Sequence, residues 1–178
     1  MRIGVAPILA GIRRVFIAGT GFLAAAPATA VLSAAAHAQG VISERNVSMQ
    51  MARTMADAAM ECSPGGKGLS VTIVDRAGQI KVMVRGDGSP PTGAELSRRK
   101  AYTARTFRRP SLEWAKRTET ELAGQRMLAD VIPLGGGLPI KVGDDVIGAV
   151  GVSGTTGGQQ ADEDCAKAAI AKVADQLK

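Results

Sequence analysis

The side chains best suited to chemistry gather in one short segment near the middle of the chain. Six cations fall within twelve residues there, and a tyrosine lies among them: Arg98, Arg99, Lys100, Arg105, Arg108 and Arg109, with Tyr102. If the segment is a helix, Arg98, Tyr102 and Arg105 share one side of it, whereas Lys100 and Thr103 share another. Such a cluster suits an anionic ligand or an acidic partner surface, and it is also typical of a solvated basic face.

Two aromatic side chains lie in the same segment. Tyr102 and Phe107 offer flat surfaces against which a planar ligand could lie. For catalysis, the segment offers only Lys100 or Tyr102 as an acid or base, with the arginines binding a substrate carboxylate.

Three consecutive glycines, Gly135, Gly136 and Gly137, form a second segment that could contact a ligand. They lack the spacing of the dinucleotide-binding fingerprint, and no Lys-Ser or Lys-Thr pair follows them. They join two expected strands and do not open a helix, so the phosphate-binding geometry of a helix N-terminus is missing. We expect these glycines to allow a close backbone turn beside a ligand or a neighbouring subunit.

The chain contains two cysteines, Cys62 and Cys165. Cys62 falls at the end of the first expected helix, and Cys165 near the start of the last. A disulfide between them is one interpretation, provided that the two helices pack antiparallel. Two buried thiols that behave as small hydrophobic side chains are the other.

The first 38 residues have the composition of an export signal. Arginines occur there without any acidic residue, a mildly apolar run covers 15–32, and an A-x-A pattern ending at Ala38 predicts cleavage after that residue. The pair Arg13-Arg14 is similar to a twin-arginine export motif, although such pairs are also common in ordinary secretory signals. A membrane anchor is the alternative, but glycine and proline interrupt the run. We expect a periplasmic or secreted protein.

Cleavage there would also remove the chain's only histidine, His37. The remaining protein would lack the imidazole that many bases, nucleophile partners and metal sites require. Because three arginines and no acid would be lost, the net charge would fall from +6 to +3. Nucleic acid is therefore not an expected partner. Residues 39–178 are enough for a single domain with its own core.

The hydrophobic pattern of residues 39–178 predicts an α+β domain. Ser43 is the expected N-cap of the first helix, and Ser111 that of the helix after Pro110. We expect a five-stranded antiparallel sheet, with the terminal helices on one face and the middle helices on the other, in a profilin-like arrangement. Expected helices cover 43–61, 94–107, 111–118, 119–128 and 161–177, and expected strands cover 69–74, 79–85, 132–134, 138–142 and 146–152.

Six segments that span nearly all of residues 39–178 occur in the order of one known family. They are SVTIVDRAG (70–78), RGDG (85–88), RKAYTA (99–104), GGLPI (136–140), IGAVGVSG (147–154) and DEDCA (162–166). Together they resemble the GlcG and HbpS type of small haem-binding domain, also called haem-degrading, which is also found as the C-terminal part of PduO-type proteins.

The resemblance implies an α+β fold, self-assembly into dimers and often octamers, and binding of haem or a corrinoid in some members. Secreted members resemble redox or haem sensors that work with a membrane partner. Peroxide-dependent haem breakdown has also been attributed to that type. From this resemblance we expect a homo-oligomer of two to eight subunits and a membrane sensor as a further partner.

Carried onto this chain, the resemblance places the ligand region around Lys100, Tyr102 and Thr103, at the bend 109–111, and at the loop 135–137. Ser111 stands where haem-binding relatives offer a threonine oxygen, which makes it a candidate axial ligand of iron. Some relatives supply a histidine, which residues 39–178 lack. A tyrosine, serine, methionine, neutral lysine or water would have to take its place.

Two functions from different classes follow. The first is a non-catalytic binder of haem or a related tetrapyrrole or corrinoid, held by apolar contact and by arginine pairing with carboxylates. The second is a small enzyme or accessory protein acting on an organic acid, as in glycolate utilisation. An oligomeric scaffold without a ligand is a third interpretation. The expected ligand-binding residues are Arg98, Lys100, Tyr102, Thr103, Arg105, Arg109, Ser111, Gly135, Gly136 and Gly137, and the expected axial ligands are Tyr102 and Ser111.

Overall fold

A computed structural model describes residues 40–63 and 67–178, and residues Ile42–Lys178 form one compact unit within it. The expected export signal, with Arg13, Arg14 and His37, lies outside the described residues. Within the described ranges, no helix combines the length and the hydropathy that crossing a membrane requires.

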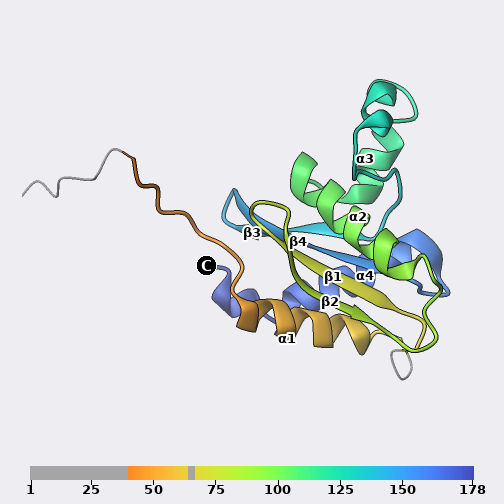
Figure 1. The fold of residues 1–178 in the computed structure, drawn as a ribbon, viewed down its shortest axis with the longest axis horizontal. Coiled ribbons are helices and arrows are strands. Elements are labelled where there is room, and N and C mark those ends of the chain that lie inside the picture. The colour runs from red at the N-terminus through yellow and green to blue at the C-terminus, as the bar shows by residue number, and fades with distance from the viewer. Residues whose placement is uncertain (1–39, 64–66) are drawn as a thin grey trace, which may run out of the picture. The chain divides into compact units, whose positions relative to one another are not determined.

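The centre of the unit is an antiparallel sheet of four strands (Figure 1). The strands are β1 (Ser70–Asp75), β2 (Ile80–Arg85), β3 (Gly137–Val142) and β4 (Asp145–Ser153), in the spatial order β2-β1-β4-β3. Two hairpins supply them, β1 with β2 and β3 with β4, and the hairpins join through β1 and β4. The two hairpins were predicted from their β-branched runs and turn residues.

The fifth strand predicted at 132–134 is wrong. Ile132 is buried, but its backbone N–H donates to the Thr103 hydroxyl at 2.9 Å, so a side chain takes the place of a neighbouring strand. The next residue, Pro133, has no N–H to donate to a sheet. The backbone then turns sharply, since the Leu134 N–H donates to the Ile132 carbonyl at 2.9 Å. The segment is therefore buried beside a helix without joining the sheet.

Helices cover both faces of the sheet (Figure 1). The first helix, α1 (Met49–Met60), and the last, α4 (Gly158–Ala171), pack on one face, and α2 (Gly93–Phe107) lies on the other, followed by α3 (Ser111–Arg117). The described residues also contain two short 3₁₀ helices, η2 (Ala123–Met127) and η3 (Ala174–Gln176).

Both predicted N-caps are wrong. The first helix begins later than expected, because the Ser48 hydroxyl accepts the Met51 N–H at 3.1 Å and Ser43 lies outside the helix. Ser111 is the first residue of α3, and Pro110 precedes it as the cap. The Ser111 hydroxyl accepts an N–H from Gly137 and does not cap its own helix. Ser48 thus caps its own helix, whereas Ser111 makes a tertiary hydrogen bond to Gly137.

The core on the α1 and α4 side consists of larger apolar side chains. It includes Met55, Ile73, Ile140 and Val150, all fully buried. Strands β1 and β4 are buried along nearly their whole length, because helices cover both of their faces. The smaller cluster on the α2 side contains Val74, Ala101, Ala104 and Ala149.

Helix α2 approaches the sheet closely because two glycines face each other beneath it. Gly137 of β3 pairs with Gly151 of β4. A Cβ atom on Gly151 would collide with the Ser97 carbonyl oxygen, and one on Gly137 with the carbonyl oxygen of Lys100. Nearby, the hydroxyls of Thr72 and Ser97 are 2.8 Å apart and join β1 to the helix. The backbone of α2 therefore rests directly on the sheet, which determines where its side chains emerge.

Candidate functional site

One flank of α2 and the edge strand β2 together form a partly exposed surface with apolar, aromatic and cationic side chains. We call it the α2–β2 face and define it by Arg98, Tyr102, Arg105, Ile80 and Met83. The first three share one side of α2, as their helical spacing predicted. Ile80 is 49% exposed and Met83 38% exposed. The surface thus offers apolar contact beside two guanidinium groups.

The strand register shows that Ile80 and Met83 lie on the α2 side of the sheet. Met83 pairs with Thr72, whose hydroxyl meets α2, and Ile80 pairs with Val74, which packs in the cluster beneath α2. Directly paired residues of antiparallel strands point to the same face. Helix α2 lies over the neighbouring strands, so these two side chains stay uncovered at the edge.

The β1–β2 turn positions the two central side chains of this face. Arg105 Nε donates to the carbonyl oxygen of Arg76 at 2.6 Å. The Tyr102 ring lies on Gly78, where an added Cβ would be 2.9 Å from Tyr102 Cε2. Tyr102 is partly exposed, and no hydrogen bond joins its hydroxyl to any group in 40–63 or 67–178. A free phenol at the surface can accept or donate to a bound ligand.

The electrostatics of this face favour an anion. Burial lowers the pKa of Arg105, and the neighbouring positive charges of Arg108 and Arg76 lower it further. Arg76 itself pairs with Asp145 at 2.7 Å and with Glu44 at 2.9 Å. Two carboxylates of the chain therefore already offset its positive charge. A carboxylate bound near Arg105 would offset the repulsion between its guanidinium group and that of Arg108.

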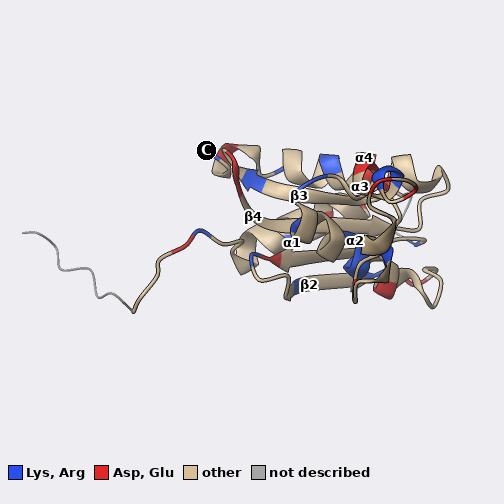
Figure 2. Cartoon of the chain, turned by 90° about the horizontal axis from the view of Figure 1, so that it is seen from above, with Lys and Arg blue, Asp and Glu red and all other residues tan. Residues whose placement is uncertain are grey.

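Most cations of the basic segment are engaged within the chain. Figure 2 shows where lysines and arginines lie along the ribbon. Arg98 pairs with Asp130 at 2.8 Å and Arg109 with Glu113 at 2.8 Å. The Arg99 guanidinium donates to the Val131 carbonyl at 2.5 Å. Arg98 and Arg99 of α2 therefore hold residues 130–131, which lead into β3. The Arg98–Asp130 pair is partly exposed, so exchanging its carboxylate for that of a ligand would cost about 1 kcal/mol or less.

Lys100 does not reach the α2–β2 face. It is 3% exposed, and its ammonium donates to Asp162 Oδ2 at 2.6 Å and to the Val152 carbonyl at 3.2 Å. Asp162 belongs to α4, which packs on the opposite side of the sheet. The lysine side chain reaches it past Gly136, where an added Cβ would be 3.0 Å from Lys100 Cδ. Lys100 thus forms a buried ion pair that joins helices from the two faces.

Thr103 is fully buried and also faces the protein interior. Its hydroxyl donates to the Arg99 carbonyl at 2.8 Å and accepts the Ile132 N–H. Phe107 stacks on Trp114 with ring centroids 4.6 Å apart, so one of the two flat surfaces expected for a ligand has an internal partner. Of the two aromatic residues in the segment, Tyr102 is the one on the α2–β2 face.

The glycine loop 135–137 contacts the protein's own helices. The Gly135 N–H donates to Gln159 Oε1 at 2.5 Å, and the Gly137 N–H donates to the Ser111 hydroxyl at 2.8 Å. Burial raises the pKa of Glu163, while the N–H groups of Leu112 and Gly136 partly oppose that rise. The close backbone approach expected of these glycines is present, and α2, α3 and α4 are the elements that use it.

The two expected axial ligands of iron therefore differ in access. Ser111 is fully buried and its hydroxyl accepts the Gly137 N–H, whereas Tyr102 is partly exposed. Within 40–63 and 67–178, no three His, Cys, Asp or Glu side chains gather as metal ligands. The structure brings Arg98, Tyr102 and Arg105 to one surface, and it places Lys100, Thr103, Ser111 and the glycine loop in the interior beside it.

Sequence reasoning did not single out Ile80, Met83, Asp130 or Asp162. The first two belong to β2, and the apolar residues of this strand do not indicate which face of the strand the helices would leave exposed. Asp162 falls at the start of the helix expected at 161–177, where acids are common. Its buried pairing with Lys100 depends on residues 62 positions apart in sequence.

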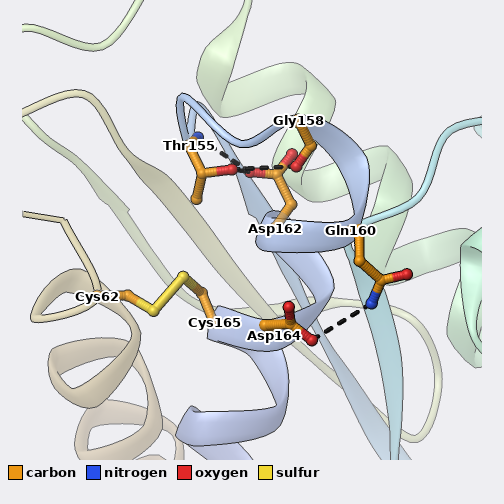
Figure 3. Close-up of a disulfide and its surroundings, with 7 residues drawn as sticks. All are labelled: Cys62, Thr155, Gly158, Gln160, Asp162, Asp164 and Cys165. Atoms are coloured by element: carbon orange, nitrogen blue, oxygen red, sulfur yellow. Dashed lines mark hydrogen bonds between the residues drawn. A yellow bond between two sulfur atoms is a disulfide. The ribbon is translucent and has the colours of Figure 1, made fainter.

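The two cysteines are joined in the structure. Cys62 and Cys165 form a disulfide with Cα atoms 5.6 Å apart (Figure 3). The bond links the end of α1 to α4, the pairing offered by the sequence as one of two alternatives.

Comparison with known families identifies the domain. Residues 47–171 match the family model described as haem degrading protein HbpS-like. The chain belongs to this family. Over 108 residues it is 33% identical to protein GlcG of Escherichia coli strain K12, covering 60% of this chain and 81% of GlcG. A further relative is an uncharacterized 15.0 kDa protein from the dhaT-dhaS intergenic region of Citrobacter freundii. It is 36% identical over 89 residues, which span 48% of this chain and less than two thirds, 63%, of that protein.

Two solved structures with related sequences have a similar fold. A double mutant of HbpS from Streptomyces reticuli has a TM-score of 0.70 and 31% identity, covering 83% of this chain and 97% of that one. A PduOC complex with haem has a TM-score of 0.64 and 27% identity, covering 71% of this chain and 94% of that one. The expected family resemblance is thus confirmed. The α+β class with an antiparallel sheet is confirmed as well, with four strands in place of five.

Proposed function

We propose that this protein binds haem, or a closely related tetrapyrrole, on the α2–β2 face without transforming it. The observation that carries the proposal is the partly exposed Tyr102 between Arg98 and Arg105, beside the uncovered side chains of Ile80 and Met83. Membership of an HbpS-like haem-degrading family and similarity to a haem-bound PduOC structure support this choice of ligand.

The side chains fit the parts of such a ligand. Ile80 and Met83 supply apolar contact for the flat macrocycle, and burying it there is favourable at about 25 cal/mol per Å² of apolar surface. Arg105 and Arg98 pair with its carboxylates through charge-assisted hydrogen bonds. The Tyr102 hydroxyl, which has no partner among the described residues, is an oxygen donor of a kind that proteins use to hold haem iron. A corrinoid with acidic side groups would use the same contacts.

Binding is favoured over catalysis by the state of Lys100. Its ammonium is buried against Asp162 and the Val152 carbonyl, so it is not available to a substrate on the α2–β2 face. The proposal of an enzyme acting on an organic acid therefore loses one of its two acid–base candidates. Tyr102 is the other, and its role as a ligand of iron uses the same oxygen.

The proposal extends to the context in which the protein works. We infer export through residues 1–38, because this segment has the charge and apolar pattern of a signal. Assembly into a homo-oligomer and contact with a membrane sensor are part of the same proposal, and they rest on the resemblance described above. Mass spectrometry of natively isolated protein would give both the mature N-terminus and the mass of any bound small molecule.

Haem titration of the purified protein tests the ligand. We expect the Soret band to shift at micromolar protein concentration. Tyr102→Phe should change the visible bands of bound ferric haem, because it removes the phenol oxygen and preserves the ring. Arg105→Gln should weaken binding by about tenfold through the loss of one charge-assisted contact.

Arg53→Gln is the matched control, because Arg53 is an exposed arginine of α1 on the other side of the sheet. It should leave haem affinity unchanged. Absence of any Soret shift in the unmodified protein would overturn the proposed function. Equal affinities in all three variants would instead refute the assignment to the α2–β2 face.

A further inference from the structure

The N-terminal half of α4 buries few side chains. The buried residues of α4 are Asp162, Cys165, Ala166 and Ala169, so only Asp162 and Cys165 are buried in its first two turns. Residues 158–160 are exposed. Alanine and glycine contribute little apolar area, so this half of the helix depends on specific bonds. Figure 3 shows the two buried side chains on the same stretch of helix.

The first of these bonds is the disulfide. It joins two cysteines that lie 103 residues apart in the sequence. The bond links α4 to Cys62, which lies just after α1. Cys62 is exposed, whereas Cys165 is 4% exposed. A thiol in solution can therefore approach the bond from the Cys62 side.

The second bond is the buried ion pair, three residues before Cys165. Asp162 Oδ2 accepts from Lys100 Nζ at 2.6 Å, and Oδ1 accepts from the Thr155 N–H at 3.0 Å and the Thr155 hydroxyl at 2.8 Å. Both oxygens of the carboxylate are thus used, and Figure 3 shows the bonds from Thr155. A displacement of this helical turn would leave Lys100 buried without its counter-charge.

The same half of α4 also covers backbone donors that lie beside α2. Gln159 accepts the Gly135 N–H, and Glu163 accepts the Leu112 N–H at 2.9 Å. These two contacts hold the glycine loop and the start of α3. If the helix end moved away, both N–H groups would become available to water or a ligand.

We propose that the Cys62–Cys165 disulfide is a redox-responsive latch that keeps the N-terminal half of α4 closed over the glycine loop and Lys100. In the oxidised protein the disulfide acts together with the ion pair and with the hydrogen bonds of Gln159 and Glu163. Reduction removes the one covalent link, and residues 155–165 open locally while the sheet stays folded. This inference goes beyond haem binding and does not depend on it.

A dithiol, as in proteins with a Cys-X-X-Cys motif, is the class of reductant that the latch requires. Its thiolate attacks Cys62 Sγ, the S–S bond breaks, and Cys165 leaves as a thiolate that takes up a proton. The second thiol of the reductant then displaces Cys62, which also ends as a thiol. Two electrons and two protons pass to the protein, and the reductant becomes a disulfide.

Hydrogen exchange measured by mass spectrometry on the oxidised and the dithiol-reduced protein, without haem, tests the latch. We expect amides in 155–165 and 135–137 to exchange at least about tenfold faster after reduction, with protection in β1 and β4 unchanged. Identical exchange in both states would overturn the proposal, and so would equal loss of protection throughout the sheet. Mass labelling of free thiols confirms the redox state in each sample.

Variants separate the latch from general destabilisation. The pair Cys62→Ser with Cys165→Ser should reproduce the reduced pattern, and if it does not fold, titration of the natural protein through dithiol redox buffers replaces it. Asp162→Asn should loosen the same residues with the disulfide intact. Asp164→Asn, an exposed neighbour on α4, should not. An unchanged exchange pattern in Asp162→Asn would refute the role of the buried ion pair in holding this half of α4. Soret titrations of both redox states then report haem binding separately, so the two proposals can fail independently.

Discussion

On one face of the sheet, α1 and α4 rest on a layer of large apolar side chains; on the other, α2 rests on glycine, alanine and hydroxyl groups. The first face contains Met55, Ile73 and Val150 in a continuous core. Beneath α2, Gly137 and Gly151 allow direct contact between helix backbone and sheet. On the first face, packing of large apolar side chains and a disulfide hold the helices to the sheet. On the second, close backbone contact and hydrogen bonds hold α2.

This difference explains where a ligand surface can exist. Close packing of α2 over β1, β3 and β4 leaves the edge strand β2 outside its cover, so Ile80 and Met83 remain exposed. On the opposite side, Val82 and Val84 of the same strand pack against the core. One strand thus presents a structural face and an open face, and the arginines of α2 border only the open one.

The largest expected effect comes from breaking the bond between the two faces. Lys100→Met should lower the free energy of unfolding by about 3–5 kcal/mol, because it leaves the Asp162 carboxylate buried without its counter-charge. Chemical denaturation measures the loss. Adding Asp162→Asn should recover much of it, since the neutral amide needs no counter-charge and its oxygen can still accept from Thr155. A single variant as stable as the natural protein would contradict the role of this pair.

The next effect tests the apolar face. Ile73→Ala should cost about 3 kcal/mol through lost transfer energy and the cavity left in the core. The measurement is again the free energy of unfolding from denaturant titration. Ile80→Ala on the open face is the matched control, and as an exposed truncation it should stay within about 0.5 kcal/mol of the natural protein. Equal losses at both positions would mean that the β2 edge is covered in solution.

Enlarging a side chain should be the damaging change on the α2 face. Gly151→Ala places a Cβ against the Ser97 carbonyl oxygen and should destabilise the protein by about 1–3 kcal/mol by pushing α2 away from the sheet. Thermal unfolding and a haem titration would report stability and site geometry separately. In the control Gly124→Ala, an added Cβ meets no atom within 4 Å. A tolerated Gly151→Ala would contradict the close seating of α2.

The smallest effect is a pH dependence at the start of α4. Because burial raises the pKa of Glu163 above 4.5, the folded protein binds this proton more tightly than the unfolded chain does. The contribution is thus fully present below pH 4.5 and is lost as pH rises through the folded pKa. Glu163→Gln, which can still accept the Leu112 N–H, should flatten this part of the pH profile. Denaturation midpoints on both sides of that window measure it; an unaltered profile would argue against Glu163.

Patterns local in sequence predicted the elements well. Both hairpins, the helix at α2 and the shared side of Arg98, Tyr102 and Arg105 followed from spacing alone. Errors arose where a local signal competed with a distant partner. Residues 132–134 look like a strand, yet the Ile132 N–H donates to the Thr103 hydroxyl and Arg99 binds the carbonyl of the preceding Val131. Ser111 looks like a cap, yet Gly137 takes its hydroxyl.

For the candidate site, the sequence determined which residue types lie on α2 and which family the domain resembles. It left open which of them reach the surface, since that depends on how deeply α2 sits on the sheet. Tertiary structure decided this through Gly137 and Gly151, which face each other across two strands. It also paired Lys100 with Asp162 in the interior and left Tyr102 partly exposed. Helical periodicity is local and can be read from spacing, whereas pairing between distant residues is decided only when the chain is folded.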